Sequence, residues 1–341
     1  MKLSHILAGD RVTVSCELFP PKTGAAWERV DDVLRDTAAL RPDFISVTYG
    51  AGGSTSKRTL ELAARLQDTY RVPALAHLTC VSATREEVAR RAEELRAAGI
   101  ENILALRGDI PQDAPFPRAG QFRYANELVS CLRSLPGGEA LCIGAACYPE
   151  GHVECPHFAA DLDNLKRKVD AGVDFLTTQM FFDNDVLYRF LFRALRRGIT
   201  VPVLAGIMPV ISVRQIRRSC ELSGTVMPPR LQGIADRFGD DPAAMRQAGI
   251  AYATEQILDL IAHGVNHIHI YTMNRPDVAA KIMDNLSAVL RPNGGDRLGG
   301  GPALPGAPPA RPAAGCAGCG KTDCPFRRAQ TPTGGGSPCP S

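Results

Sequence analysis

The feature that most constrains the fold is a regular alternation of short apolar runs with amphipathic stretches. The strand-like runs are Val12–Leu18, Phe44–Tyr49, Ala74–Thr79, Asn102–Leu106, Cys142–Tyr148, Phe175–Met180, Val203–Ile207 and His267–Tyr271. Continuous apolar runs of this length between helices are typical of parallel strands that are buried on both faces. Most neighbouring runs lie about thirty residues apart, which suits one strand–helix unit.

The stretches between these runs have helical periodicity. They are Ala25–Leu40, Lys57–Tyr70, Arg85–Ala98, Tyr124–Leu135, Phe158–Ala171, Asn184–Arg197, Val213–His263 and Pro276–Leu290. The long stretch before the last run predicts extra helices there. Eight such units favour a closed (β/α)8 TIM barrel. An open Rossmann-type sheet is the alternative, but no G-x-G-x-x-G turn follows the first strand, and the glycines of residues 50–54 have the wrong spacing.

Composition excludes several classes of protein. Hydrophobic residues make up 45% of the chain, and the formal net charge is only +3. That charge is too small to predict a nucleic-acid or membrane-surface partner. No apolar run is long enough to span a membrane, and the N-terminus lacks the apolar stretch of a secretory signal. We therefore expect a cytoplasmic protein, with the seven cysteines before residue 290 reduced.

The composition changes after Leu290. Residues 1–290 form the predicted catalytic barrel, whereas residues 291–341 are rich in glycine and proline and predict a disordered tail. The tail carries a cysteine cluster, namely Cys316, Cys319, Cys324 and Cys339. This spacing is compatible with zinc or an iron–sulfur centre, or with a flexible extension that carries free thiols.

Polar residues gather where the predicted strands end, which is where barrel enzymes place their active sites. Glu17 is a carboxylate inside an apolar strand, where it is costly unless it is used. A second carboxylate, Asp109, ends the fourth strand, and the two could take different roles because their environments differ. No Ser-His-Asp arrangement and no metal-ligand spacing occurs before the tail.

Cationic and amide groups predict an anionic cofactor at this rim. Arg107 ends the fourth strand, and Asp161, Asn164 and Lys168 fall on one face of a predicted helix. A solvated helix face is the alternative reading of that pattern. Side chains that could hydrogen-bond a heteroaromatic ring are those of Thr48, His77 and Tyr148.

Together the strand-end motifs resemble those of the bacterial methylenetetrahydrofolate reductase family. The motifs are Glu17-Leu18-Phe19-Pro20-Pro21-Lys22, Ser46-Val47-Thr48-Tyr49-Gly50-Ala51, His77-Leu78-Thr79-Cys80, Ala105-Leu106-Arg107-Gly108-Asp109, Tyr148-Pro149-Glu150-Gly151-His152, the run 164–172, and Tyr271-Thr272-Met273-Asn274-Arg275. They occur in the order and at the spacing of that family and cover about residues 10–290.

The resemblance implies a flavoenzyme that uses NADH or NADPH to reduce 5,10-methylenetetrahydrofolate by ping-pong hydride transfer through FAD, for one-carbon metabolism and methionine synthesis. Implied flavin contacts are Thr48, His77, Leu106, Arg107, Gly108, Asp109, Tyr124, Ala125, Tyr148, His152, Asp161, Asn164, Arg167, Lys168 and Tyr271. Glu17, Gln179 and Gln215 would contact the folate. Glu17 would protonate the leaving nitrogen, and Asp109 would stabilise developing positive charge. A homo-oligomer is also implied.

One departure from the family affects the electron donor. Ser219 stands where well-studied relatives carry an aromatic residue that packs on the folate or the nicotinamide. Another donor, such as an electron-transfer protein docked through the cysteine tail, therefore stays open. So do a non-catalytic assembly subunit and another flavin barrel such as a proline-oxidising dehydrogenase, although neither explains Glu17 together with Gln179.

Overall fold

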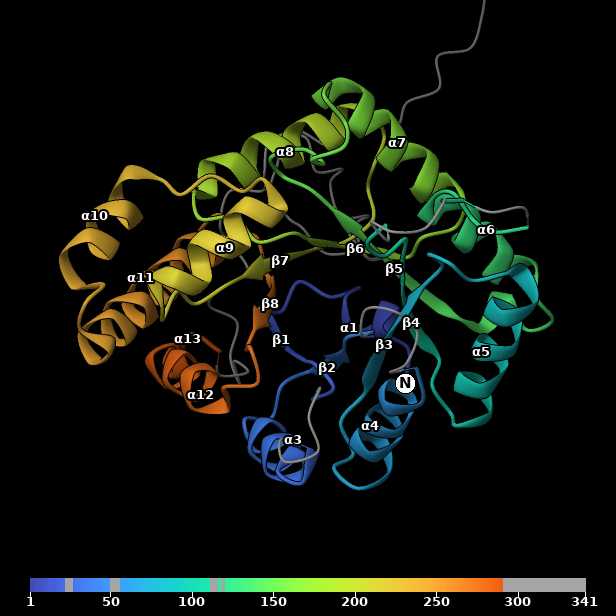
Figure 1. The fold of residues 1–341 in the computed structure, drawn as a ribbon, viewed down its shortest axis with the longest axis horizontal. Coiled ribbons are helices and arrows are strands. Elements are labelled where there is room, and N and C mark those ends of the chain that lie inside the picture. The colour runs from blue at the N-terminus through green and yellow to red at the C-terminus, as the bar shows by residue number, and fades with distance from the viewer. Residues whose placement is uncertain (22–26, 50–55, 111–115, 118–119, 291–341) are drawn as a thin grey trace, which may run out of the picture. The chain divides into compact units, whose positions relative to one another are not determined.

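The computed structural model describes residues 1–21, 27–49, 56–110, 116–117 and 120–290. Eight parallel strands close into a barrel in sequence order (Figure 1). They are β1 (Thr13–Leu18), β2 (Phe44–Val47), β3 (Ala74–Thr79), β4 (Asn102–Leu106), β5 (Cys142–Cys147), β6 (Phe175–Thr178), β7 (Val203–Ile207) and β8 (His267–Tyr271). The predicted barrel is confirmed, and the open-sheet alternative is wrong.

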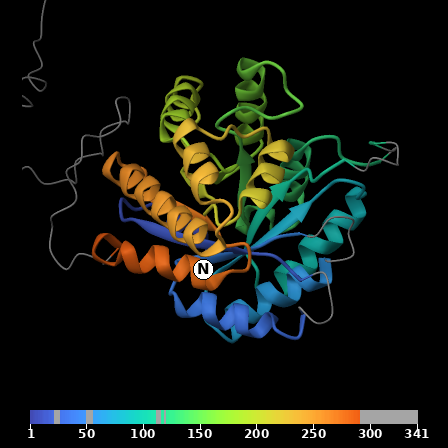
Figure 2. The same cartoon turned by 60° about the vertical axis from the view of Figure 1, so that its left-hand side comes forward.

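Helices surround the strands. They are α3 (Val30–Ala39), α4 (Ser56–Asp68), α5 (Arg85–Ala97), α6 (Ala125–Ser134), α7 (Phe158–Asp170), α8 (Asn184–Arg196), α9 (Val213–Ser223), α10 (Pro229–Phe238), α11 (Pro242–Ala262), α12 (Pro276–Asn285) and α13 (Ser287–Leu290), with a 3-10 turn at Gly138–Ala140. The extra helices predicted before the last strand are α9, α10 and α11. Figure 2 shows α11 and α12 side by side, where Arg246 and Asp277 form an ion pair of 2.7 Å.

Local chemistry explains several helix ends. At the start of α5, the Thr84 hydroxyl accepts from the Glu87 amide while the Glu87 carboxylate accepts from the Thr84 amide. At the start of α9 the Ser212 hydroxyl accepts from the Gln215 amide, and Gly224 ends that helix in the left-handed conformation (φ 72°) that favours glycine. Residue 25, where the helix before β2 was predicted to begin, lies outside the described residues.

Three predicted strands extend too far at their carboxyl ends, and one of them, β5, ends at Cys147, one residue before the predicted Tyr148. β2 ends at Val47 and β6 at Thr178, because in each case the chain leaves the sheet after one further backbone hydrogen bond. Those bonds join the Thr48 amide to the Leu18 carbonyl at 2.9 Å and the Gln179 amide to the Cys147 carbonyl at 2.7 Å. Thr48 and Gln179 therefore lie at the barrel rim and not within strands.

A short helix that the periodicity does not reveal, α1 (Leu3–Ile6), closes the amino end of the barrel (Figure 1). Leu3 and Ile6 pack with inward-facing side chains that include Phe44 and Phe175. Asn102 holds the helix, since its side chain accepts from the Leu3 amide at 2.9 Å and donates to the Met1 carbonyl at 3.1 Å. With this end packed, access to the interior is from the carboxyl ends of the strands.

The chain divides into two units, Met1–Gly306 and Ala307–Ser341. The predicted domain boundary at residue 290 stays a prediction, because all later residues lie outside the described part. Within the described ranges, no helix is long and apolar enough to cross a membrane. The seven cysteines of those ranges are all free thiols.

Candidate active site

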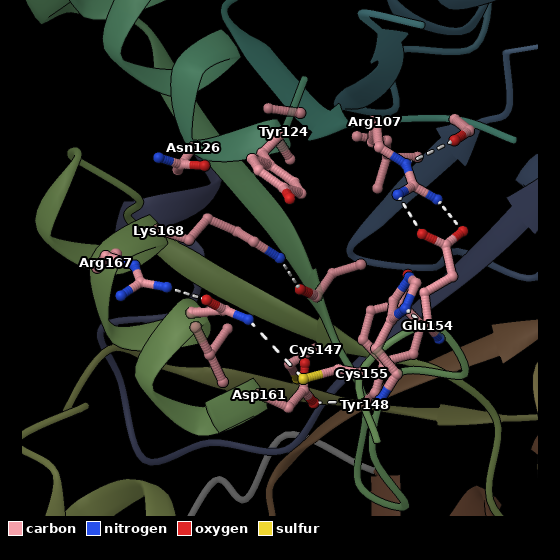
Figure 3. A pocket seen from close by; sticks show the side chains of 18 of the residues that line it. Arg107, Tyr124, Asn126, Cys147, Tyr148, Glu154, Cys155, Asp161, Arg167 and Lys168 are labelled. Carbon is pink, nitrogen blue, oxygen red and sulfur yellow. Dashed lines mark hydrogen bonds and ion pairs between the residues drawn. The ribbon is translucent and has the colours of Figure 1, made fainter. Parts of the chain in front are cut away.

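A cavity of about 540 Å³ opens at the carboxyl ends of β4 and β5 (Figure 3). Its walls come from these strand ends, the first residues of α6, the loop after β5 and one face of α7. The predicted cofactor residues that line it are Leu106, Arg107, Gly108, Asp109, Tyr124, Ala125, Tyr148, His152, Asp161, Asn164, Arg167 and Lys168. Residues that the sequence scatters over some sixty positions are thus brought to one site.

Three cationic side chains line this cavity. Arg107 forms a bidentate ion pair with Glu154, and Arg167 donates to the side-chain oxygen of Asn164. The Lys168 ammonium donates to the Ala146 carbonyl at 2.8 Å. Burial lowers the pKa of Lys168 from its usual value. This collection of cations suits an anionic ligand.

The predicted polar face of α7 turns toward the cavity. Asp161 accepts a hydrogen bond from the His152 amide at 3.2 Å, which ties the helix to the loop after β5. Burial raises the pKa of Asp161. Asn164 and Lys168 follow on the same face, and both line the cavity.

Two aromatic rings form part of the wall near β5. The Tyr148 and His152 rings meet edge to face, with centroids 4.6 Å apart. Burial raises the pKa of Tyr148 to about 12, so its hydroxyl stays protonated and can donate. Burial also lowers the pKa of His152, which favours a neutral ring. Both groups can therefore hydrogen-bond a ligand without adding charge.

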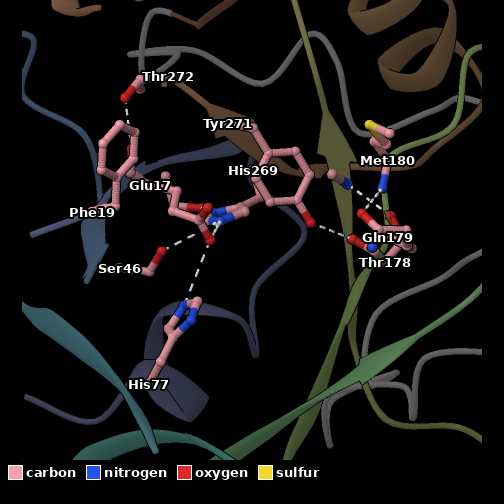
Figure 4. Close-up of polar contacts among 12 residues, drawn as sticks. Glu17, Phe19, Ser46, His77, Thr178, Gln179, Met180, His269, Tyr271 and Thr272 are labelled. Carbon is pink, nitrogen blue, oxygen red and sulfur yellow. Dashed lines mark hydrogen bonds and ion pairs between the residues drawn. The ribbon is translucent and has the colours of Figure 1, made fainter. Parts of the chain in front are cut away.

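A second cluster surrounds Glu17 inside the barrel mouth (Figure 4). One carboxylate oxygen of Glu17 lies 3.6 Å from Nε2 of His77 and 3.8 Å from Nε2 of His269. His77 is buried, and burial lowers its pKa to about 4, so this imidazole is neutral near pH 7. The Tyr271 hydroxyl donates to the Thr178 carbonyl at 2.5 Å, and its ring meets His269 edge to face.

Tyr271 relates this cluster to the cavity. Burial raises its pKa well above the usual value, with further contributions from Glu17 and from Cys147 and Tyr148. The last two residues line the cavity. The Tyr271 hydroxyl donates to the carbonyl of Thr178, which pairs with Cys147 of the cavity wall, so the Glu17 cluster and the cavity are neighbouring parts of one region at the barrel mouth.

Several predicted residues lie outside the cavity wall. His77, Tyr271 and Glu17 belong to the inner cluster. Thr48 follows β2, and its carbonyl accepts from the Thr59 hydroxyl at 2.9 Å. The two predicted folate contacts also lie outside the cavity wall. Gln179 follows β6, and its side-chain oxygen accepts from the Met180 amide at 2.9 Å. Gln215 is exposed in the first turn of α9.

Sequence reasoning missed Glu154 and His269. Glu154 is an exposed loop residue whose partner lies 47 positions away, so no local pattern marks it. His269 had a weak signal, because it lies two residues before Tyr271 on β8 and shares its side of the strand.

The described residues contain no group of three or more His, Cys, Asp or Glu side chains arranged to hold a metal. The cysteines predicted for metal binding, Cys316, Cys319, Cys324 and Cys339, lie outside the described part of the chain.

Comparisons with known proteins agree with this geometry. The family model described as methylenetetrahydrofolate reductase matches residues 2–287. The chain is 34% identical over 276 residues to the 5,10-methylenetetrahydrofolate reductase of Escherichia coli, which covers 81% of this chain and 91% of that protein. It is also 34% identical over 299 residues to methylenetetrahydrofolate reductase (NADH) 1 of Arabidopsis thaliana, covering 84% of this chain. The chain spans about half the length of that plant relative, 50%.

A solved structure shares the fold at low sequence identity. It is a Clostridium thermocellum protein described as binding two copies of 5-methyl-5,6,7,8-tetrahydrofolic acid. The TM-score is 0.56 at 12% identity, and the match covers 84% of this chain and 99% of that one. The family model spans nearly the whole described barrel, and the Escherichia coli relative matches over most of its length. The chain therefore belongs to the methylenetetrahydrofolate reductase family.

Proposed function

We propose that the protein reduces 5,10-methylenetetrahydrofolate to 5-methyltetrahydrofolate, with FAD in the cavity and a reduced nicotinamide as electron donor. The observation that carries this proposal is the pairing of a cationic cavity with a separate carboxyl, Glu17, held among imidazoles at the barrel mouth. A non-catalytic subunit would have no use for that pairing.

The residues of the cavity fit FAD. A volume of about 540 Å³ lies within the range of cofactor pockets. Arg107, Arg167 and Lys168 suit the diphosphate. The first residues of α6 also line the cavity, and no side chain caps that helix, so its amides are available to an anion. Tyr148 offers a hydroxyl to the flavin ring system.

A bound flavin supplies hydride transfer between the nicotinamide and the folate. The role of the protein is to hold the ring systems and to provide a proton. Glu17 is proposed to protonate the nitrogen that leaves when the imidazolidine ring of the folate opens. Its O–H bond breaks as the new N–H bond forms. Asp109 is exposed beside the cavity, where its carboxylate would stabilise developing positive charge.

Gln179 and Gln215 are proposed to contact the folate. Gln179 lies at the rim after β6, and Gln215 is exposed on α9. Ser219, on the same helix, is partly buried. A small side chain there offers no surface on which the folate or the nicotinamide could stack. NADH, NADPH and an electron-transfer protein should therefore each be tested as the electron donor.

The remaining proposals concern the cell and the assembly. We place the activity in the cytoplasm, in one-carbon metabolism that feeds methionine synthesis, and expect a homo-oligomer. We also propose that the tail cysteines bind zinc or an iron–sulfur centre. Elemental analysis of the full chain and of its Cys316→Ser variant tests this: equal, metal-free samples would rule it out.

Flavin content and product formation test the proposed function directly. The purified protein should release FAD on denaturation and convert 5,10-methylenetetrahydrofolate to 5-methyltetrahydrofolate when NADH or NADPH is added. A folded protein that carries no flavin and does not retain added FAD would overturn the proposal.

A further inference from the structure

We propose that His269 is a positioning residue for the proton of Glu17, and that Ser15 sets His269 for this task. Glu17 and the ring of His269 would share a single proton, which Glu17 delivers during the reaction. This inference rests on the proposed function and adds residues to its proton-donating step.

Ser15 determines which nitrogen of His269 carries a hydrogen. His269 is 2% exposed, and its Nδ1 lies 2.7 Å from the Ser15 hydroxyl oxygen. That hydroxyl donates to the Ile268 carbonyl at 3.2 Å. A hydroxyl has only one hydrogen, so both contacts are satisfied together only when the Ser15 oxygen accepts from His269. The arrangement that satisfies both contacts places the hydrogen of His269 on Nδ1.

The opposite nitrogen then faces Glu17. In a neutral imidazole with a hydrogen on Nδ1, Nε2 has a free lone pair. This nitrogen lies 3.8 Å from the Glu17 carboxylate oxygen and 3.5 Å from the Ser46 hydroxyl (Figure 4). Two acceptors that face each other in a poorly solvated site repel, and a proton between them removes the repulsion. A separation of 3.8 Å is longer than a hydrogen bond, so the two side chains would close slightly to hold one proton between them.

The surroundings add no other charge to this pair. Nε2 of His77 lies 3.6 Å from the same oxygen of Glu17 and has no hydrogen-bond partner among the described residues. Phe44 stacks on His269, and Tyr271 meets the ring edge to face. The side chains of His77, Phe44 and Tyr271 are neutral near pH 7. The net charge of the cluster therefore depends on the proton between Glu17 and His269.

The step balances without a further reactant. The O–H bond of Glu17 breaks, an N–H bond forms on the leaving nitrogen of the folate, and the carboxylate keeps the electron pair. His269 keeps its hydrogen on Nδ1 throughout. A proton from water restores the pair before the next turnover.

Three variants separate this role from a structural one. His269→Leu removes the acceptor, and His269→Gln restores a polar group at that position. Ser15→Ala releases the orientation of the ring. The matched control is Thr13→Val, because the Thr13 hydroxyl lies 2.9 Å from Nδ1 of His267 on the same pair of strands, two residues away, without contact to Glu17.

The experiment follows the two half-reactions of the FAD-loaded full chain by anaerobic stopped flow between pH 5 and pH 9. We expect reduction by NADH to be unchanged in all variants. Reoxidation by 5,10-methylenetetrahydrofolate should be about 100-fold slower in His269→Leu, as for loss of a general acid. Its pH profile should differ from that of the wild type, because the proton of Glu17 loses the acceptor that faces it. His269→Gln should recover part of the rate.

Each outcome has a distinct meaning. Reoxidation of His269→Leu at the wild-type rate and with the wild-type pH profile would overturn the inference and leave the proposed function intact. An equal slowing in Thr13→Val would also overturn it, since the effect would then be structural. Failure of the wild type itself to react with the folate would overturn the proposed function first, and this inference with it.

Discussion

Arg107 and Glu154 form a bidentate ion pair in which both nitrogen–oxygen distances are 2.6 Å (Figure 3). The Arg107 guanidinium holds the pKa of Glu154 below its usual value. The arginine side chain is only 17% exposed, whereas the glutamate is 49% exposed. Glu154 therefore holds the Arg107 guanidinium in the cavity wall from the side that faces solvent. The pair also ties the end of β4 to the loop after β5.

Replacing Arg107 should weaken flavin binding. In Arg107→Gln, the loss of a charge-assisted contact of about 1.5–3 kcal/mol predicts FAD affinity lower by about 10- to 100-fold. Glu154→Gln keeps the cation and should change the affinity by less than the arginine variant does. Titration of the apoprotein with FAD, followed by flavin fluorescence, measures both. Equal affinities in Arg107→Gln and the wild type would remove Arg107 from the binding site.

Lys168 should make flavin binding sensitive to alkaline pH. Burial lowers its pKa, so its positive charge is lost as pH rises, at a pH below the ordinary lysine range. The affinity for FAD should decline over that interval, and arginine cannot cause this because it stays charged. Lys168→Met should bind FAD about tenfold or more weakly and lack the decline. A wild-type affinity that is constant with pH would contradict this role.

Gly206 provides space for Tyr271. A Cβ at position 206 would lie 2.6 Å from both the Thr178 carbonyl oxygen and the Tyr271 ring. Gly206→Ala should displace the ring and cost about 1–3 kcal/mol in the free energy of unfolding. The folate half-reaction should slow as well.

The matched control for this change is Gly233→Ala on α10, where a Cβ meets no heavy atom within 4 Å. It should stabilise the protein by about 0.5–1 kcal/mol, as expected for alanine in a helix. Chemical denaturation and the half-reaction rates report both variants. Similar stability changes in the two would show that the space around Tyr271 is not limiting.

The helix that closes the barrel bottom should contribute strongly to stability. Leu3 is 0% exposed in the apolar cluster beneath the barrel, so Leu3→Ala should cost about 2–5 kcal/mol in the free energy of unfolding. The neighbouring His5 is exposed, and His5→Ala should stay within about 0.5 kcal/mol of the wild type. Urea denaturation distinguishes them, and equal midpoints would mean that α1 is not packed in solution.

The strands and most helices were predictable because each one repeats the same physical pattern. A parallel strand is buried on both faces, so β3, β4, β7 and β8 are visible as apolar runs with correct ends. α1 was not predictable, since a helix of four residues is too short for a periodic pattern. It forms because the open bottom of the barrel buries Leu3 and Ile6.

Within the site, the sequence indicated which residues line the cavity where they lie at a strand end or on one helix face. Arg107 and Lys168 are such residues. It failed where the partner is distant in sequence, since a charged loop residue such as Glu154 is usually solvated. It also failed at His269, whose importance depends on a contact with Glu17 on the neighbouring strand β1. Only the closed sheet brings those two side chains together.

The central claim is that one flavin passes electrons from a nicotinamide to a folate, and an anaerobic two-step titration tests it most directly. The purified protein is first mixed with NADH or NADPH, and 5,10-methylenetetrahydrofolate is then added while the visible spectrum is recorded. We predict that the flavin absorbance bleaches with the nicotinamide and returns with the folate, with formation of 5-methyltetrahydrofolate. A flavin that is reduced, by nicotinamide or chemically, but is not reoxidised by the folate would contradict the claim.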